Sequence, residues 1–391
     1  MARMNEVLKS FQDLQSEDKP KTEQTSDKRE SAFVGFSGLD AIKKAITENL
    51  GGSPTPAKPS SESIRAADLA RTPADFPKIS SAKSSTPSES ELKAIQTQDE
   101  NAANQLYMEL HRVIGNVVQG IKDKKSLDPK SLEKYILSVY ESVTSSEFLF
   151  LKAIQRKRYA TWLVSHSINV AIFTIKIGVS MKYDREKLTK LGLAALLHDV
   201  GMINVPNNII FKHGRLTASE FAIIKQHPNY GYEIVKHLKS DYPNIVDVVL
   251  QEQEREDGSG YPQGLTGDKI SEFAKVVGLA DVFEALVHGR AYREGFITYN
   301  AIQKIIESRG KQFNAKIIRA LINGVSMFPV GSMVKLSTDE IARVLSVNSQ
   351  RPVRPVVEVL IDSDGNKIKN PIRLNLEEEP LIYIVKPLIE S

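Results

Sequence analysis

The chain has 391 residues, a formal net charge of +4 and a hydrophobic share of 41%. One hydrophobic core rarely grows beyond about 250–300 residues, so this length predicts two or three domains. The absence of cysteine excludes disulfides, thiolate metal sites and cysteine nucleophiles. The small positive charge is not arranged as a stripe of Lys and Arg with interleaved aromatic residues, which argues against DNA binding.

Neither a secretion signal nor a membrane span is expected. The N-terminal stretch MARMNEVLKSFQDLQ has no apolar core. No apolar run approaches the roughly 18–20 residues that a membrane span requires. These patterns favour a soluble protein of the cytoplasm.

Residues 1–100 have the composition of a largely disordered arm. Residues 15–32 are almost entirely polar, and residues 51–90 are rich in Pro, Ser, Ala and Thr. Such stretches bury too little apolar surface to offset the entropy of ordering. Two short amphipathic segments interrupt the arm, and each could dock a partner or form only a transient helix. Their apolar positions are Val7, Leu8, Phe11 and Leu14 in the first and Leu39, Ile42, Ile46 and Leu50 in the second.

Residues 101–324 have the apolar spacing of a helical bundle with about ten helices. Start signals mark several helices. Asp128-Pro129 supplies an N-cap followed by proline at the first helical position. Thr217 and Glu220 have the spacing of a capping box, and Thr298 precedes another periodic run.

Residues 325–391 are expected to form a small antiparallel β extension. After Phe328-Pro329 the apolar period changes from that of a helix to that of a strand. Asp364-Gly365 is a strong hairpin-turn signal. The predicted strands are 334–336, 342–347, 356–361, 372–376 and 381–385. The expected fold is therefore mainly α, with a helical bundle, a C-terminal β extension and a disordered N-terminal arm.

Histidine and aspartate recur at apolar helix positions in the predicted bundle. His198 and Asp199 are adjacent at the end of a helix rich in Leu and Ala, and Asp281 is a lone carboxylate in VVGLADVFEALV. An ionised carboxylate in such surroundings is costly unless it is paired or bound to a metal. His166 lies on an otherwise apolar face in SHSINVAIFTIKIG, and His227 ends the predicted helix EFAIIKQH.

Each of these residues alone has an ordinary explanation as a hydrogen-bonded core residue or a helix cap. Together, the order His…His-Asp…Asp supplies imidazole and carboxylate ligands that suit Mn, Fe, Zn or Mg. Such ions polarise a phosphoryl oxygen and lower the pKa of bound water. The joint pattern therefore predicts a metal site.

A second motif, DGSGYPQGL at residues 257–265, identifies a family. It follows His198-Asp199 and precedes the ADVFEAL segment and Arg290-Ala291-Tyr292-Arg293. Over roughly residues 150–385 the chain resembles the HD-GYP branch of the HD phosphohydrolase superfamily. The resemblance implies an HD-domain bundle with its core over about 150–324 and a centre of two or three metal ions. It also implies hydrolysis of cyclic di-GMP to pGpG or GMP in bacterial signal transduction.

The resemblance further implies site residues by position. His198 and Asp199 are expected to carry catalysis. The implied metal ligands are His166, His198, Asp199, His227 and Asp281. The implied substrate-binding residues are Arg290, Arg293, Gly260, Tyr261 and Pro262. A guanidinium group suits phosphate oxygens, and the Gly-Tyr-Pro loop flanks the pocket and is thought to contact protein partners.

Three positions depart from the family pattern. Met202 stands where the family has a Lys after His-Asp-x-Gly, and a thioether cannot donate to a phosphate. Glu252-Gln253 replaces an adjacent His-His pair, and Glu252 can supply a carboxylate that suits Mn, Mg or Fe. Trp162 stands where some members have a Glu that serves a third metal. The expected cofactor is one divalent metal ion, or two with a weak second site.

Three functions stay open from the sequence. The first is a metal-dependent phosphodiesterase acting on cyclic di-GMP. The second is a non-catalytic protein that binds cyclic di-GMP, or a partner through the Gly-Tyr-Pro loop or the N-terminal arm; the third is a single-metal phosphohydrolase of another nucleotide. Arg290 and Arg293 favour the first two over the third, whereas Met202 and Glu252-Gln253 favour the second over the first.

Overall fold

The computed structural model describes residues 89–154, 162–212, 214–288, 298–348, 351 and 353–388, with side chains from residue 97 onward. From residue 98 onward, the described residues belong to one compact unit. The two amphipathic segments predicted in the N-terminal arm lie outside the described residues, and so do Arg290 and Arg293.

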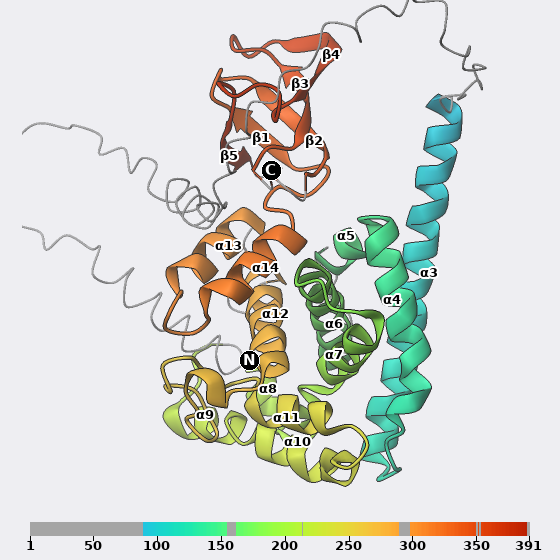
Figure 1. The fold of residues 1–391 in the computed structure, drawn as a ribbon, viewed down its shortest axis with the longest axis vertical. Coiled ribbons are helices and arrows are strands. Elements are labelled where there is room, and N and C mark those ends of the chain that lie inside the picture. The colour runs from blue at the N-terminus through green and yellow to red at the C-terminus, as the bar shows by residue number, and fades with distance from the viewer. Residues whose placement is uncertain are drawn as a thin grey trace, which may run out of the picture. The chain divides into compact units, whose positions relative to one another are not determined.

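The described chain is a helical bundle followed by an antiparallel sheet, which confirms the mainly α fold with a β extension (Figure 1). The helices of the first half are α3 (Glu89–Lys122), α4 (Glu133–Ser145), α5 (Phe148–Ile154), α6 (Trp162–Ser180), α7 (Arg185–Leu197), α8 (Asn207–Ile210) and α9 (Ala218–Ile224). Those of the second half are α10 (His227–Val235), α11 (Pro243–Gln251), α12 (Glu272–His288), α13 (Thr298–Glu307) and α14 (Ala315–Gly324). Short 3₁₀ helices lie at Pro129–Leu132, Val200–Asn204, Lys236–Leu238 and Gly267–Lys269.

The predicted helix starts are present, with one exception. Asp128 accepts a hydrogen bond from the backbone N–H of Lys130 at 3.0 Å. Thr217 and Glu220 form the reciprocal capping box. The exception is α3, which begins at Glu89 rather than near Asn101. Residues 89–100 contain neither Pro nor Gly and several strong helix formers, so the helix extends further back than the apolar spacing indicated.

Helix α6 runs through the core and packs against α7, α12 and α14. Of the helices in the described ranges, it is the one long and apolar enough to cross a membrane by length and composition. The expectation that no apolar run reaches this length is therefore wrong. In this structure 78% of its apolar window is buried, which is the position of a core helix.

The sheet has five strands in the order β4-β3-β2-β1-β5, with every neighbouring pair antiparallel. The strands are β1 (Met333–Leu336), β2 (Ile341–Ser346), β3 (Val356–Ile361), β4 (Lys367–Asn375) and β5 (Ile384–Leu388). The turn between β3 and β4 places Gly365 at a positive φ of 86°, a conformation that glycine adopts without strain. The Asp364-Gly365 hairpin is thereby confirmed.

The sequence predicted that the last strand begins at Leu381, but β5 begins at Ile384. The cause is Arg354, whose guanidinium donates to four backbone carbonyls in residues 376–382, just before β5. These acceptors are Leu376, Glu379, Pro380 and Ile382, at 2.7–3.3 Å. Fixed in this way, the segment turns instead of pairing, and Leu381 stays 87% exposed.

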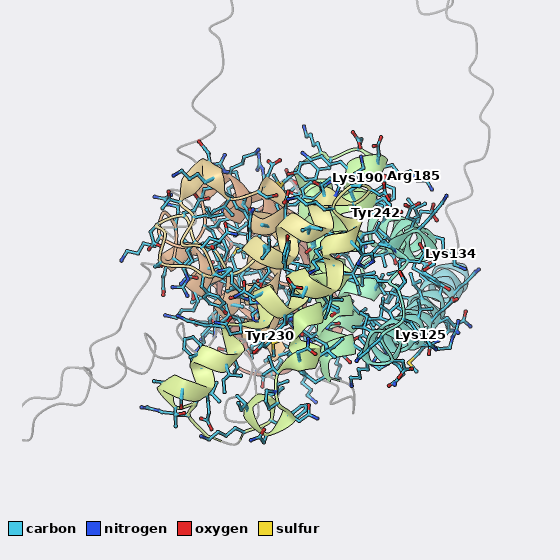
Figure 2. All side chains as sticks on the ribbon, turned by 90° about the horizontal axis from the view of Figure 1, so that it is seen from below. Lys125, Lys134, Arg185, Lys190, Tyr230 and Tyr242 are labelled. Atoms are coloured by element: carbon cyan, nitrogen blue, oxygen red, sulfur yellow. The ribbon has the colours of Figure 1, made fainter. Side chains whose placement is uncertain are left out.

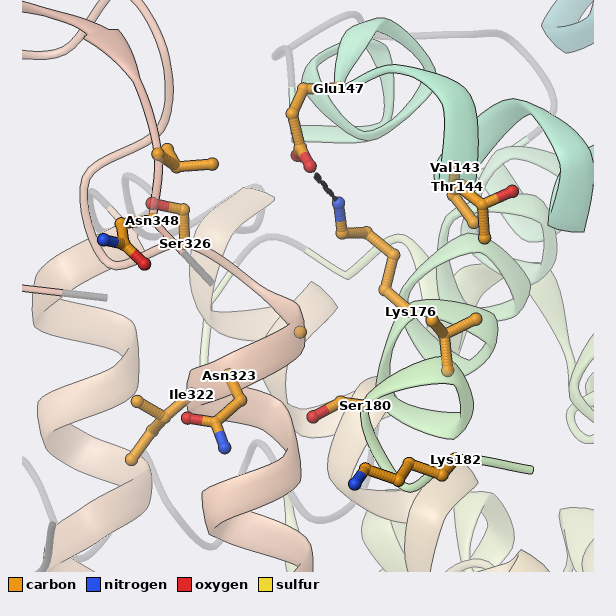
Figure 3. A pocket seen from close by; sticks show the side chains of 13 residues that line it. Val143, Thr144, Glu147, Lys176, Ser180, Lys182, Ile322, Asn323, Ser326 and Asn348 are labelled. Atoms are coloured by element: carbon orange, nitrogen blue, oxygen red, sulfur yellow. Dashed lines mark hydrogen bonds and ion pairs between the residues drawn. The ribbon is translucent and has the colours of Figure 1, made fainter. Parts of the chain in front are cut away.

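A cavity of about 610 Å³ lies beside the C-terminal half of α6 (Figure 3). Lys176 extends into it and binds both carboxylate oxygens of Glu147, at 2.6 and 2.7 Å. The Lys176 side chain is only 7% exposed and its ammonium also lies 4.9 Å from the centre of the Phe150 ring. The ion pair therefore neutralises a cation that has little access to water.

Removal of Glu147 is expected to destabilise the bundle more than removal of a surface partner. Glu147→Ala leaves Lys176 buried without its carboxylate, and we expect a loss of about 2 kcal/mol in the free energy of unfolding, discounted because Glu147 itself is partly exposed. The matched control is Glu141→Ala, which breaks the exposed pair with Arg185, labelled in Figure 2. That change should cost about 0.5 kcal/mol or less in urea denaturation. Equal losses for the two variants would contradict this account.

Candidate metal centre

Six side chains that could serve as metal ligands converge between five helices of the bundle. They are His166 in α6, His198 and Asp199 after α7, His227 at the start of α10, Glu252 after α11 and Asp281 in α12. Each is at most 2% exposed. Uncompensated polar groups at this depth are costly, so their concentration here indicates a binding site.

The backbone brings His227 close to Asp199 through a glycine contact. A Cβ atom at Gly201 would lie 2.0 Å from the carbonyl oxygen of His227 and 2.4 Å from the nitrogen of Gly231. Only glycine allows α10 to rest on the turn that follows Asp199. The sequence placed His227 at the end of the helix EFAIIKQH, and this expectation is wrong. Helix α9 stops at Ile224, and His227 begins α10.

Asp199 lies between two sets of ligand atoms. Its Oδ1 is 3.3 Å from Nε2 of His227, and its Oδ2 is 3.4 Å from Nε2 of His166 and 3.9 Å from that of His198. Neither carboxylate oxygen has a hydrogen-bond partner among the described residues. Two compact ligand sets result, namely His166–His198–Asp199 and Asp199–His227–Glu252, in each of which the ligand atoms lie within 4.8 Å of one another. Asp199 thus has the geometry of a bridging carboxylate.

The three imidazole rings are held by their outer nitrogens. Nδ1 of His198 donates to the carbonyl of Ala195, and Nδ1 of His227 donates to that of Ile224, each at 2.8 Å. Nδ1 of His166 is 2.8 Å from the carboxylate of Glu284. Each Nε2 atom therefore faces the centre, which is the arrangement by which proteins orient histidine ligands.

Glu252 occupies the place that the family gives to an imidazole. Its Oε1 lies 3.1 Å from Nε2 of His227, and its Oε2 accepts a hydrogen bond of 2.8 Å from Gln253. The same amide nitrogen lies 3.4 Å from Oδ2 of Asp281. Gln253 thus directs a donor toward the two carboxylates, so Glu252 is the ligand candidate of this pair.

Asp281 lies beside the first of the two ligand sets. Its Oδ1 lies 3.3 Å from Nε2 of His166 and has no hydrogen-bond partner among the described residues. Neither compact set includes it. The carboxylate could join the first set through His166, and its assignment as a ligand stays a prediction.

Opposite charges shift the pKa values of these groups against the effect of burial. Burial lowers the pKa of His166, but Glu284, Asp199 and Asp281 outweigh it and hold that pKa well above its ordinary value. Burial likewise lowers the pKa of His227, and Asp199 and Glu252 raise it overall. Burial raises the pKa of Asp199, yet the surrounding histidines bring it well below its usual range.

The charge balance and the donor set fit a divalent metal. Four carboxylates, those of Asp199, Glu252, Asp281 and Glu284, surround three imidazoles, so the site carries excess negative charge when the rings are neutral. Several facing atoms have no hydrogen-bond partner among the described residues, among them Nε2 of His166 and Nε2 of His198. Imidazole nitrogen with carboxylate oxygen suits Mn, Fe or Zn, and a carboxylate-rich set extends the range to Mg.

The Gly-Tyr-Pro loop lies against the same centre. Tyr261 is buried, and its ring meets that of His227 edge-on with 6.2 Å between centroids. Glu254, to which the sequence gave no role, holds the loop. Its Oε1 accepts backbone N–H groups of Gln263 and Gly264 at 2.7 and 3.1 Å, and its Oε2 accepts that of Leu265 at 2.9 Å. The sequence shows a carboxylate three residues before the motif, but only the fold shows that it binds backbone groups 9–11 residues further along the chain.

Two of the departures from the family pattern cover the centre with apolar surface. Met202 is 1% exposed and packs with Val205, Ile209, Ile224 and Tyr261. Trp162 stacks on His166, with ring centroids 5.3 Å apart and planes inclined by 16°. A buried thioether therefore replaces the family's lysine, and an aromatic ring shields one face of the first ligand.

Residues 148–317 match the model of the HD domain family, and residues 333–391 match that of the KOW domain associated with the HD domain. The fold and the buried His-Asp centre thus define an HD-domain protein. Within this class the chain is similar to the HD-GYP family in its motifs, and its relatives are named as cyclic di-GMP phosphodiesterases. It departs from the family at the His-His and Lys positions.

The relatives include the cyclic di-GMP phosphodiesterase PA4108 of Pseudomonas aeruginosa, 29% identical over 61% of this chain and 58% of that protein. Another is the cyclic di-GMP phosphodiesterase PdeB of Borreliella burgdorferi, 31% identical over 52% of this chain and 54% of that protein. A 3'3'-cGAMP-specific phosphodiesterase of Vibrio cholerae is 27% identical over 51% of this chain and 41% of that protein. The chain spans little more than half the length of the first two.

Among solved structures, the HDG"Y"P protein Bd1817 of Bdellovibrio bacteriovorus covers 61% of this chain and 73% of its own, with a TM-score of 0.43 and 18% identity.

Gly201→Ala should disrupt the centre through its backbone contact. The added methyl group meets the carbonyl of His227, so we expect a loss of about 3 kcal/mol in the free energy of unfolding and loss of Mn²⁺ binding, measured by urea denaturation and calorimetry. Gly115→Ala in α3 is the control, because its Cβ would meet nothing within 4 Å. That variant should be as stable as the parent or more stable by about 0.5–1 kcal/mol. Normal Mn²⁺ binding by Gly201→Ala would refute the contact's importance.

Glu254→Gln should loosen the Gly-Tyr-Pro loop. An amide has one acceptor oxygen in place of two, so at least one of the three backbone donors is left unsatisfied, at a cost of about 1–3 kcal/mol. Hydrogen exchange at residues 263–265 should accelerate by roughly 10–100-fold, the equivalent of that cost. Glu233→Gln, a change at a surface ion pair with Lys236, is the control and should leave this loop unchanged.

Proposed function

We propose that the chain is a metal-dependent phosphodiesterase that hydrolyses cyclic di-GMP to pGpG or GMP in cytoplasmic signalling. The observation that carries the proposal is the bridging position of Asp199 between two buried ligand sets, with both of its oxygens unpartnered among the described residues. Carboxylate-bridged pairs of metal ions are a recurrent device for phosphodiester cleavage. The relatives named as cyclic di-GMP phosphodiesterases support the choice of substrate.

Divalent cations held by these ligands would supply Lewis-acid chemistry toward a phosphodiester. The chain's own residues prepare the site for it. Ala195, Ile224 and Glu284 fix the three imidazole rings, so that their inner nitrogens stay directed at the centre. Trp162 and Tyr261 cover neighbouring faces with aromatic surface and limit the access of water. We assign to Arg290 and Arg293 the binding of the negatively charged phosphates of the substrate, as the family pattern implies.

The proposed cofactor is a pair of ions of which the second favours Mn, Fe or Mg. The set Asp199–His227–Glu252 has two carboxylates and one imidazole, a harder donor set than one with additional imidazoles. The first set has two imidazoles and one carboxylate. Occupancy of the second set should therefore vary more strongly with the metal supplied.

The deciding experiment incubates the purified protein with cyclic di-GMP in parallel with Mn²⁺, Fe²⁺ and Mg²⁺ and identifies the products. The control is the double variant His198→Ala, Asp199→Ala, which removes ligands of both sets. Release of pGpG or GMP by the parent and not by the control is the expected result. Absence of product with all three metals would overturn the proposed reaction on this substrate.

Glu252 is expected to be essential to that activity. Glu252→Ala removes a carboxylate from the second set and should lower kcat/KM by at least about 10–100-fold, the loss caused by removing even an outer partner of a metal ligand. Glu186→Ala, which breaks the surface pair with Lys190, should leave kcat/KM unchanged. Excess Mn²⁺ should restore part of the Glu252→Ala activity, because the remaining ligands are intact. A parent-like rate in Glu252→Ala would exclude the second set from the mechanism.

Binding of cyclic di-GMP without turnover is a second candidate, and one observation favours it. Met202 fills an apolar cluster at the position where the family presents a lysine, so that donor is missing beside the centre. Calorimetry with cyclic di-GMP distinguishes the two functions. Saturable binding together with an absence of product would support the non-catalytic function.

A further inference from the structure

A chain of hydrogen bonds leads from the metal centre to a helix outside the matched HD domain. It begins at Nδ1 of His166, which contacts Oε2 of Glu284 at 2.8 Å. The other oxygen of that carboxylate, Oε1, accepts from the side-chain amide of Asn169 at 3.2 Å. The amide oxygen of Asn169 in turn accepts from the hydroxyl of Tyr107 at 2.9 Å. Tyr107 belongs to α3, and the HD match begins at residue 148.

Every residue in this series of hydrogen bonds is buried. Tyr107, Asn169 and Glu284 are 2%, 4% and 6% exposed. Hydrogen bonds at this depth are strong and polarise one another, and a partner that is removed cannot be replaced freely by water. The two ends of the Asn169 amide also have different partners, a hydroxyl that donates and a carboxylate that accepts. Together they fix the direction in which the amide points.

A second hydrogen bond ties the same helix to the same ligand segment. His111, one helical turn after Tyr107, lies 3.0 Å through Nε2 from the hydroxyl of Ser165, the residue before His166. Helix α3 is held on the bundle by buried residues at helical spacing, Ala103, Tyr107, Leu110 and Ile114. The polar contacts thus lie on the packed face of α3.

We propose that Tyr107 is a positioning residue of the metal centre and that α3 is a working part of the site. Through Asn169 and Glu284 the Tyr107 hydroxyl fixes the orientation of His166 and maintains the carboxylate that increases its basicity as a ligand. The inference rests on the metal centre of the proposed function. It makes the affinity of the first ligand set dependent on where α3 lies.

The chain contains a built-in reporter for this dependence. Trp162 is the only tryptophan of the protein and stacks on His166 at 5.3 Å. Paramagnetic Mn²⁺ bound beside His166 should quench its fluorescence, so a titration of the full-length protein reports the affinity of the first set with no substrate present. A His166→Ala variant shows which part of the quenching belongs to this site.

Three variants test whether the hydrogen bonds from Tyr107 to His166 affect metal affinity. Tyr107→Phe should weaken Mn²⁺ binding about ten-fold, the low end of the effect of outer partners, and Glu284→Gln, which alters the direct contact, should weaken it by at least as much. Tyr299→Phe is the matched control, because it removes a buried hydroxyl that bonds a side-chain amide, that of Gln303, outside the chain. Its Mn²⁺ affinity should equal that of the parent.

Unchanged Mn²⁺ affinity in Tyr107→Phe, with only a lower melting temperature, would overturn the inference and leave Tyr107 a packing residue. A parent protein that binds Mn²⁺ yet hydrolyses no cyclic di-GMP would refute the proposed function and leave the inference standing. A parent in which Mn²⁺ causes no quenching beyond that of His166→Ala would overturn the metal centre and the inference together.

Discussion

The buried carboxylate of Asp199 is the group on which the rest of the centre depends. Its two oxygens face two histidine-containing ligand sets from a position that water does not reach. Such a group is tolerable only where its surroundings favour the ionised form, and the neighbouring histidines hold the pKa of Asp199 well below its usual range despite burial. The glycine contact at Gly201 holds α10 against the turn after Asp199, so the bridging position is built into the backbone.

The two replaced positions change the centre in different ways. Glu252 keeps a ligand atom in place of an imidazole and contacts His227 directly, which preserves a second set with harder donors. Gln253 turns a donor toward two carboxylates and so stabilises their arrangement in the absence of metal. Met202, by contrast, converts a polar position into part of an apolar cluster. The site therefore lacks the lysine donor of the family pattern and keeps two ligand sets that could hold cations.

Helix α6 joins the functional and structural features of the bundle. It carries His166 and Asn169 toward one end and Lys176 toward the other, where the pair with Glu147 neutralises a buried cation. By length and apolar composition α6 resembles a membrane span, yet the surrounding helices bury it. Through Tyr107 and His111, α3 contacts the same helix on both sides of the ligand. The HD domain and the helix before it are thus connected by polar contacts as well as by packing.

The sequence by itself determined the class of fold, the helix caps at Asp128 and Thr217, the hairpin at Gly365 and the residue types of the centre. These features depend on periodicity and on short motifs, which are local properties of a chain. Only the tertiary structure decided that Glu252 joins His227 and Asp199, that Asp281 lies beside His166 and Gln253, and that His227 begins a helix. It also revealed the hydrogen bonds that Glu254 and Tyr107 make. Tyr107 and Glu284 lie far apart in sequence, and no spacing rule relates such residues, because their proximity arises from how whole helices pack.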